Sequence, residues 1–141
     1  MNGAQHDRVH RLGWLSLTAS LSFVAAQGML PVVDALAMWC GYGVGAALTP
    51  DLDLARSRGQ SLLRRFPPAY LLAQAYAKAF AHRGVSHWPF IGTLTRFLWF
   101  FGPPACAFAL LGGSLDLRLA LMAFVGLCVA DLLHIVCDAI G

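Results

Sequence analysis

The chain has 141 residues, of which 58% are hydrophobic and only 12% are charged, and its formal net charge is +3. Soluble domains are typically about 45–50% apolar and about 25% charged. The composition therefore argues against an ordinary soluble domain. It favours a single domain, residues 1–141, embedded in a membrane.

Four apolar stretches, at residues 12–30, 32–48, 90–111 and 117–140, predict four membrane-spanning helices. A spanning helix needs about 20 mostly apolar residues, with a range of about 17–25. The second stretch is short and rich in glycine, which would let a neighbouring helix approach closely. The beginning of the chain also resembles a signal peptide, but three more apolar stretches follow, so we expect a retained first helix. The alternative is a set of buried helices in a soluble bundle.

The segment at residues 50–89 separates the second and third apolar stretches. Pro50 is expected to end the second helix, and the basic stretch at residues 56–65 is expected to form a loop. After Pro67 and Pro68, residues 69–81 have apolar side chains at helical spacing. They predict a helix on the membrane surface or against the bundle. The expected fold is all-α, a four-helix transmembrane bundle with a cytoplasmic surface helix in this central segment.

The basic residues are unevenly distributed along the chain, and Lys and Arg accumulate on the cytoplasmic side of membrane proteins. Arg118 alone lies near the connection between the third and fourth stretches, at the start of the fourth, and Arg96, near the start of the third, is expected to extend back toward the basic side. The other eight basic residues precede the first stretch or lie in the central segment: Arg8, Arg11, Arg56, Arg58, Arg64, Arg65, Lys78 and Arg83. Both termini and residues 50–89 are therefore expected on the cytoplasmic side.

Most aspartates and histidines lie in four short clusters, and the chain has no glutamate. Such side chains are costly beside apolar surface unless they are paired or bind a metal. The expected topology places all four clusters at one face of the membrane. The clusters are His6 with Asp7, the PDLD sequence at 50–53, the HRGVSH sequence at 82–87, and Asp131, His134 and Asp138.

The last cluster has the spacing of a shared helix face. His134 and Asp138 are four residues apart, and Asp131 lies three residues before His134. An imidazole and a carboxylate one turn apart suit one metal ion or two neighbouring ones. The structural alternative is an Asp–His hydrogen bond within the membrane.

The two central clusters are weaker signals by themselves. Asp51 and Asp53 are two residues apart, and paired aspartates are common in turns. His82 and His87 are five apart, so they converge only across a break at Gly84. Taken together, however, imidazoles and carboxylates at one membrane face predict one or two divalent ions. This ligand mixture favours Zn²⁺, Mn²⁺ or Fe²⁺ over Ca²⁺ or Mg²⁺.

The motif order also resembles known families. The GAQHDR, PDLDL and HRGVSHWPFIGT sequences are similar to those of uncharacterised metal-binding membrane proteins of bacteria. They also resemble predicted membrane-bound metal-dependent hydrolases related to the LexA-binding inner-membrane protein. A distant similarity to helical enzymes of the zinc phospholipase C type implies phosphoester hydrolysis. The resemblance implies metal ligands at His6, Asp51, Asp53, His82, His87, His134 and Asp138.

These observations predict a metal-dependent hydrolase, with zinc as the first expectation, at the cytoplasmic face of the bacterial inner membrane. His82 is expected to be a ligand or a proton-transfer group, and Arg83 to stabilise an anionic substrate. Asp131 or Asp7 is expected to orient a ligating imidazole. The expected partners are membrane lipids and a small-molecule or lipid phosphoester, with no nucleic acid. One alternative is a non-catalytic metal-stabilised scaffold or regulator. A small ion transporter is disfavoured because the polar residues gather at one end of the helices.

Overall fold

A computed structural model of the chain describes residues 3–48, 52, 58–80, 88 and 90–140, without the side chains of residues 3–7 and 58. This described part contains six α-helices and no strand, which confirms the all-α prediction. The chain divides into two compact units. Unit 1 consists of Met1–Ala46 and Asp116–Gly141, and unit 2 consists of Ala47–Leu115.

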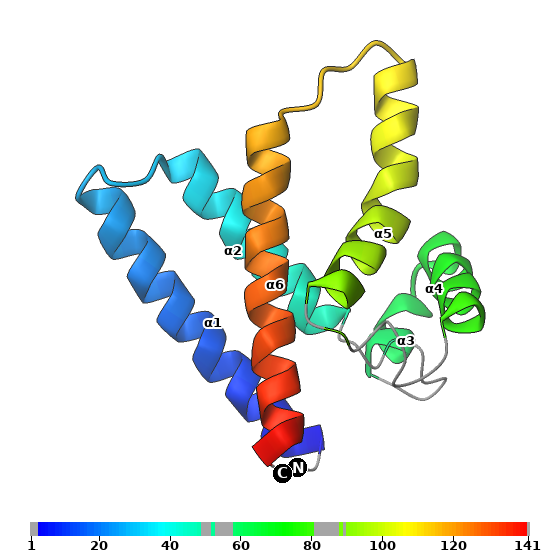
Figure 1. Cartoon of the computed structure of the whole chain (residues 1–141), viewed down its shortest axis with the longest axis horizontal. Coiled ribbons are helices and arrows are strands. Elements are labelled where there is room, and N and C mark those ends of the chain that lie inside the picture. Colours follow the sequence, from blue (N-terminus) through cyan, green and yellow to red (C-terminus); the bar gives the residue numbers. More distant parts are fainter. Residues whose placement is uncertain (1–2, 49–51, 53–57, 81–87, 89, 141) are drawn as a thin grey trace. The chain divides into compact units, whose positions relative to one another are not determined.

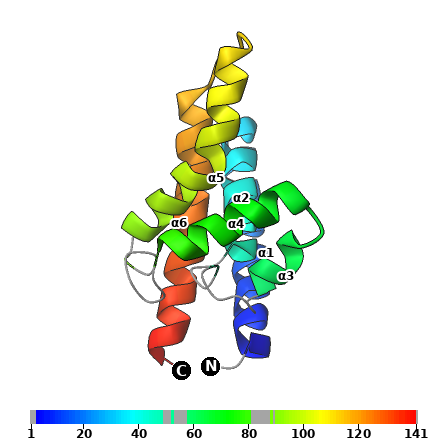
Figure 2. The same ribbon diagram turned by 90° about the vertical axis from the view of Figure 1, so that its right-hand side faces the viewer.

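Unit 1 is built from α1 (Gly3–Ala26), α6 (Leu117–Ile140) and nearly all of α2 (Val32–Ala47). A short turn joins α1 to α2 as a helical hairpin (Figure 1). The turn contains Gly28 at φ 69, a left-handed conformation that glycine adopts without steric cost. The first turns of α1 and the last turns of α6 lie at the same end of the unit in both Figure 1 and Figure 2.

The helix limits agree with the sequence prediction for α2 and α6 within one residue, but not for α1. Helix α1 begins at Gly3, nine residues before the apolar stretch, and it ends four residues before the end of that stretch. The apolar stretch marks the part of a helix that favours an apolar surrounding. Backbone hydrogen bonding continues through polar residues as well. Consequently His6 lies inside α1, whereas the prediction placed it before the first helix.

Glycines allow the backbones of α2 and α6 to come into direct contact. A Cβ atom at Gly41 would collide with the carbonyl oxygen of Ala123, and one at Gly126 would collide with the carbonyl oxygen of Met38. A Cβ at Gly45 would lie 2.7 Å from the Cβ of Ala130. The predicted role of the glycines in α2 is therefore confirmed, because a side chain at any of these positions would force the two helices apart.

A buried carboxylate joins the starts of α2 and α6. The side chain of Asp34 is only 4% exposed, and its Oδ2 accepts a hydrogen bond from Nη2 of Arg118, which is 60% exposed. The same end of α6 is capped by Asp116, whose Oδ1 accepts from the backbone N–H groups of Arg118 and Leu119. At this end, unit 1 is therefore stabilised by the ion pair of Asp34 and Arg118 and by the helix cap of Asp116.

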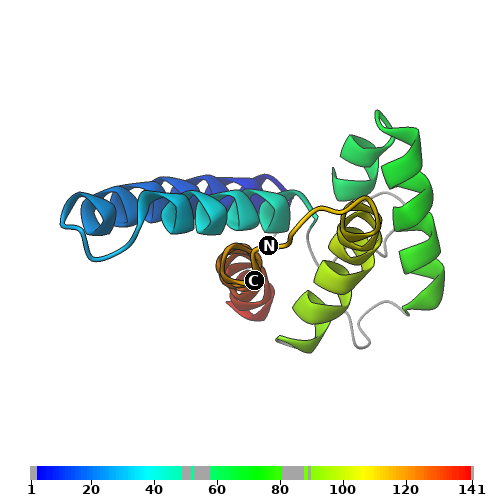
Figure 3. The same cartoon turned by 90° about the horizontal axis from the view of Figure 1, so that it is seen from above.

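Unit 2 contains α3 (Arg58–Leu63), α4 (Pro67–Ala79) and α5 (Ile91–Leu110), which lie together in Figure 3. Its core consists of Leu52, Ala73 and Tyr76, none of which is exposed to solvent. The ring of Tyr76 packs against aromatic side chains of α5, and its hydroxyl shares a 3.2 Å hydrogen bond with Thr95 Oγ1. Helix α4 therefore packs against α5, one of the two arrangements that the sequence left open.

One expectation for this unit was wrong. The basic stretch at residues 56–65 was expected to be a loop, but α3 forms within it, and its Gly59 lies against the side chain of Leu52. Arg96 is only 2% exposed, and the expectation that it extends back toward the basic side of a membrane stays a prediction. Its guanidinium donates to the carbonyl of Leu48 at 2.8 Å, just beyond the end of α2, where free carbonyls attract cations.

The predicted membrane spans receive partial support. Within the described residues, only α6 has the length and apolar composition needed to cross a membrane. Helix α2 is apolar but has 16 residues. Helix α1 begins with polar turns that carry Arg8 and Arg11, and α5 contains Arg96.

Candidate metal centre

Three predicted site residues lie on α6 and belong to the described part of the chain. Asp131 and His134 are buried, at 2% and 3% exposure, whereas the side chain of Asp138 is 44% exposed. The Nε2 atom of His134 lies 3.4 Å from Oδ2 of Asp138, one helical turn away. The predicted common face of His134 and Asp138 is therefore confirmed, and their role as metal ligands stays a prediction.

A second imidazole, which the sequence analysis did not single out, lies beside His134. The ring of His10 on α1 is stacked against the ring of His134, with a centroid distance of 5.9 Å and an interplanar angle of 29°. His10 is 8% exposed. Two buried imidazoles from opposite ends of the sequence thus lie together at the end of unit 1 where α1 begins and α6 ends.

The local sequence explains why these helices come close here. A Cβ atom at Gly13, one turn after His10, would collide with the hydroxyl of Tyr42 and would lie 2.7 Å from Cδ2 of Leu133. Without that atom, Tyr42 reaches α1, and its hydroxyl donates to the carbonyl of His10 at 3.1 Å. Gly13 therefore admits Tyr42 of α2 and the residue next to His134 to the surface of α1.

One feature of the sequence would have pointed to His10. It is four residues after His6, so the two share a face once both lie in a helix. The prediction started the first helix at residue 12, which left both histidines outside it. The helical i, i+4 spacing became meaningful only with the observed start of α1 at Gly3.

The remaining predicted site residues lie outside what the structure describes. The backbone of His6 is part of α1, but its side chain is not described. The other five belong to the central motifs and are not among the described residues: Asp51, Asp53, His82, Arg83 and His87. Their proposed roles rest on the sequence alone.

The chemistry of the described donors fits a borderline metal ion, but their number does not complete a site. Neutral imidazole and carboxylate groups are common ligands of Zn²⁺. Among the residues whose placement is described, however, no three His, Cys, Asp or Glu side chains gather closely enough to hold an ion. A metal centre at this end of unit 1 would need donors from the undescribed side chains, of which His6 is one turn from His10.

A search of protein families places the chain in a known group. Residues 1–115 match the model of a family described as "Uncharacterized metal-binding protein (DUF2227)". The chain belongs to this family. The description supports the prediction of metal binding and names neither a reaction nor a particular metal. No curated protein and no solved structure matches the chain.

The matched range divides the candidate ligands into two groups. His6, His10 and both central motifs lie within residues 1–115, whereas His134 and Asp138 on α6 lie beyond them. The family description assigns metal binding to no particular residue. In the structure, His134 of α6 contacts His10, which lies within the matched range.

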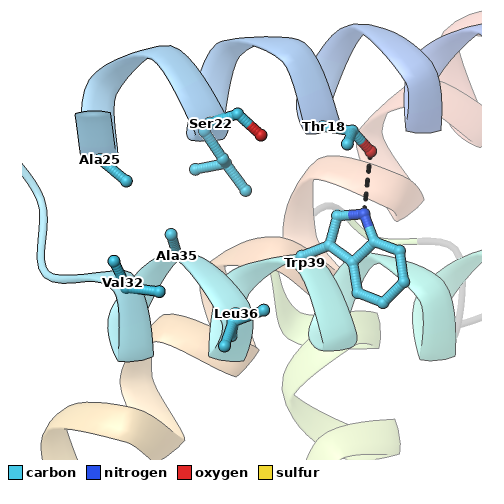
Figure 4. A pocket seen from close by; sticks show the side chains of 8 residues that line it. Thr18, Ser22, Ala25, Val32, Ala35, Leu36 and Trp39 are labelled. Atoms are coloured by element: carbon cyan, nitrogen blue, oxygen red, sulfur yellow. Dashed lines mark hydrogen bonds between the residues drawn. The ribbon is translucent and has the colours of Figure 1, made fainter. Parts of the chain in front are cut away.

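Unit 1 also contains a pocket of about 220 Å³ between α1 and α2, shown in Figure 4. It is lined mainly by apolar side chains, and its polar contact is the indole of Trp39 donating to Thr18 Oγ1 at 2.9 Å. No histidine or aspartate lines this pocket. It is therefore a gap between two helices and not part of the candidate metal centre.

Proposed function

We propose that the chain binds a divalent metal ion and that the imidazoles of His10 and His134 in unit 1 are among its ligands. The observation that carries this proposal is the stacking of these two buried rings in a member of a metal-binding family. Neutral imidazole nitrogens are common metal ligands, and these two rings lie close together. The further ligands proposed from the sequence are His6, Asp51, Asp53, His82, His87 and Asp138.

One or two ions are proposed, and zinc is the first choice. The donor set combines imidazole and carboxylate groups without a thiolate pair, which suits Zn²⁺, Mn²⁺ or Fe²⁺. Asp131 is proposed as a positioning residue for the imidazole of His134. It is buried one turn before His134, where a carboxylate can orient a ligating imidazole.

We further propose that the chain is a metal-dependent hydrolase acting on a phosphoester or lipid-like substrate. This proposal rests on the resemblance to predicted membrane-bound hydrolases, including those related to the LexA-binding inner-membrane protein. A bound ion would supply an activated water and polarise the substrate oxygen. Of the chain's own residues, His82 would transfer a proton and Arg83 would bind the anionic group.

A specific observation favours the alternative of a non-catalytic, metal-stabilised scaffold or regulator. His10, Asp131 and His134 are each at most 8% exposed. Structural metal sites are closed, whereas catalytic sites keep one coordination position open to substrate. The burial of these side chains is therefore more typical of a structural site than of a catalytic one.

The proposed location is the bacterial inner membrane, with four spans and both termini in the cytoplasm. The apolar outer surface supports it, because only 28% of the most apolar window of α6 is buried within the protein. Leu110, Leu111 and Ile140 are each at least 79% exposed. Alkaline extraction of membranes from expressing cells tests the location. Release of the chain into the supernatant would contradict it.

The central test is the metal content of the purified protein, measured by elemental analysis. Wild-type protein should carry stoichiometric metal, and His10→Ala, His134→Ala and Asp51→Ala should each lose most of it. Asp138→Asn should also reduce the metal content. Asp116→Asn is its matched control and should not, because Asp116 caps α6 at the other end of that helix. If wild-type protein binds no metal, the proposed function is wrong.

Hydrolase and scaffold are then separated by two measurements on the same samples. A screen of phosphoesters, including phospholipids in mixed micelles, should show turnover that is lost with Arg83→Ala if the chain is a hydrolase. If chelation unfolds the protein and the screen finds no turnover, the scaffold alternative is correct.

A further inference from the structure

The polar interior of unit 2 contains a fully buried glutamine. Gln60 lies in α3 and has no exposed surface. Its Nε2 donates to the carbonyl oxygen of Leu52 at 2.7 Å. A buried amide that satisfies a backbone carbonyl outside a regular helix fixes that stretch of chain, because breaking the bond would leave both groups without water.

A second glutamine sets the orientation of this amide. Gln74 of α4 donates from its Nε2 to Oε1 of Gln60 at 2.9 Å. Since Oε1 accepts from Gln74, the NH₂ group of Gln60 is the end that faces Leu52. Two hydrogen bonds in series therefore link Gln74 of α4, through Gln60 of α3, to the backbone at residue 52.

Leu52 is held on its side chain as well as on its backbone. The side chain is completely buried against Ala73 and Tyr76. Gly59 leaves room for it, because a Cβ atom there would lie 3.0 Å from Cδ1 of Leu52. Leu52 is therefore fixed from two directions, by apolar packing and by the amide of Gln60.

The position of Leu52 in the sequence gives this arrangement its significance. Leu52 is the central residue of the PDLD motif and is covalently joined to Asp51 and Asp53, two proposed metal ligands. The bond from Gln60 fixes the backbone at the residue between the two aspartates. A ligand pair requires a fixed backbone, because the entropy of ordering loose ligands weakens metal binding.

We propose that Gln60 is a positioning residue for metal binding, acting through the carbonyl of Leu52 on the aspartates at either side. This inference rests on the proposed function, because it assumes that Asp51 and Asp53 are ligands. Removal of partners that orient metal ligands typically weakens metal affinity about 10- to 100-fold. The same loss is expected when the amide of Gln60 is removed.

The test compares the Zn²⁺ affinity of four purified proteins by competition with a chelating indicator, alongside their melting temperatures. They are wild type, Asp51→Ala, Gln60→Met and Trp99→Phe. Methionine matches the length of glutamine without its hydrogen bonds. Trp99→Phe is the matched control, because it also removes one side-chain N–H donor to a backbone carbonyl of unit 2, that of Leu72 at 3.0 Å.

The expected result is loss of zinc binding with Asp51→Ala and about 10- to 100-fold weaker binding with Gln60→Met. Trp99→Phe should bind zinc like wild type, even if its melting temperature falls as much as that of Gln60→Met. Wild-type affinity in Gln60→Met overturns the inference and leaves the proposed function standing. Equal weakening in Gln60→Met and Trp99→Phe also overturns it, because the effect is then one of general stability.

Two further outcomes have defined meanings. If wild-type protein binds no zinc, the proposed function and this inference both fail. If Asp51→Ala binds like wild type, the inference fails together with the assignment of Asp51 as a ligand, whereas metal binding by the chain stands. Should Gln60→Met not fold, Gln74→Met replaces it, since it leaves Gln60 in place but removes the bond that orients its amide. Unchanged zinc affinity in Gln74→Met would then overturn the inference.

Discussion

The two units use polar side chains in different ways. In unit 1, titratable side chains pair with each other at the two ends of long helices, as with Asp34 and Arg118 at one end and His134 and Asp138 at the other, and one buried hydroxyl, that of Tyr42, donates to a backbone carbonyl. In unit 2, three side chains donate to backbone carbonyls of other segments: Gln60 to Leu52, Arg96 to Leu48 and Trp99 to Leu72. Long helices satisfy their own backbone, so their polar side chains remain available for charge pairs or metal binding.

Short helices and connecting segments leave many backbone groups without an intrahelical partner, and unit 2 satisfies them with side chains. Arg96 of α5 donates to the carbonyl of Leu48, just beyond the end of α2, in this way. Trp99 donates to the carbonyl of Leu72, which lies inside α4. The difference suggests that unit 1 depends mostly on helix packing, and unit 2 on a small core with specific hydrogen bonds. Four substitutions test this comparison, beginning with the largest expected effect.

Leu52→Ala tests the small core of unit 2. Leu52 is completely buried, so its truncation should lower the free energy of unfolding by about 2–5 kcal/mol. Amide hydrogen exchange should become faster in α3 and α4. Leu71→Ala is the matched control, because Leu71 of α4 is 69% exposed, and it should change stability by about 0.5 kcal/mol at most. Equal effects of both substitutions would show that the core is not the main source of stability.

Gly126→Leu tests the close approach of α2 and α6 in unit 1. A side chain at this position would enter the backbone of α2, and overpacking of this kind costs about 1–3 kcal/mol or more. The melting temperature should therefore fall, and near-ultraviolet circular dichroism should show altered tryptophan packing. Ala19→Leu on the exposed face of α1 serves as control. A melting temperature equal to that of wild type would mean that the helices do not touch at Gly126.

Arg118→Gln tests the buried carboxylate in unit 1. Without its partner, Asp34 would stay buried beside apolar side chains, at a cost of about 1–2 kcal/mol after allowance for the exposure of Arg118. The double variant Asp34→Asn with Arg118→Gln should recover part of this loss, because no charge then remains buried. Urea unfolding of both variants measures the difference. A double variant less stable than Arg118→Gln would contradict the proposed cause.

Trp39→Phe should have the smallest effect of the four. It removes the hydrogen bond from the indole to Thr18 Oγ1 at the pocket between α1 and α2. Because this contact is exposed, the loss should be about 0.5 kcal/mol. Thr18→Val removes the same bond from the other side, so the two single variants and the double variant form a cycle. A loss as large as that of Leu52→Ala would remove the contrast between the units.

The sequence predicted those features that depend on neighbours along the chain. The apolar stretches located α2, α5 and α6 within one residue at each end, because a continuous apolar run and a helix share the same limits there. The i, i+4 spacing of His134 and Asp138 predicted their contact for the same local reason. The early start of α1 was missed because hydropathy does not report helix formation by polar residues.

Other features were decided only by the tertiary structure. His10 looked like an isolated residue until the folded chain brought it to His134 from the other end of the sequence. Gln60 looked like part of a polar loop until α3 turned its amide toward Leu52. A local pattern fixes which face of a helix a residue occupies, but not which distant element packs on that face. The partners of His10 and Gln60 were set by close packing at Gly13 and Gly59, where a missing side chain makes room for another part of the chain.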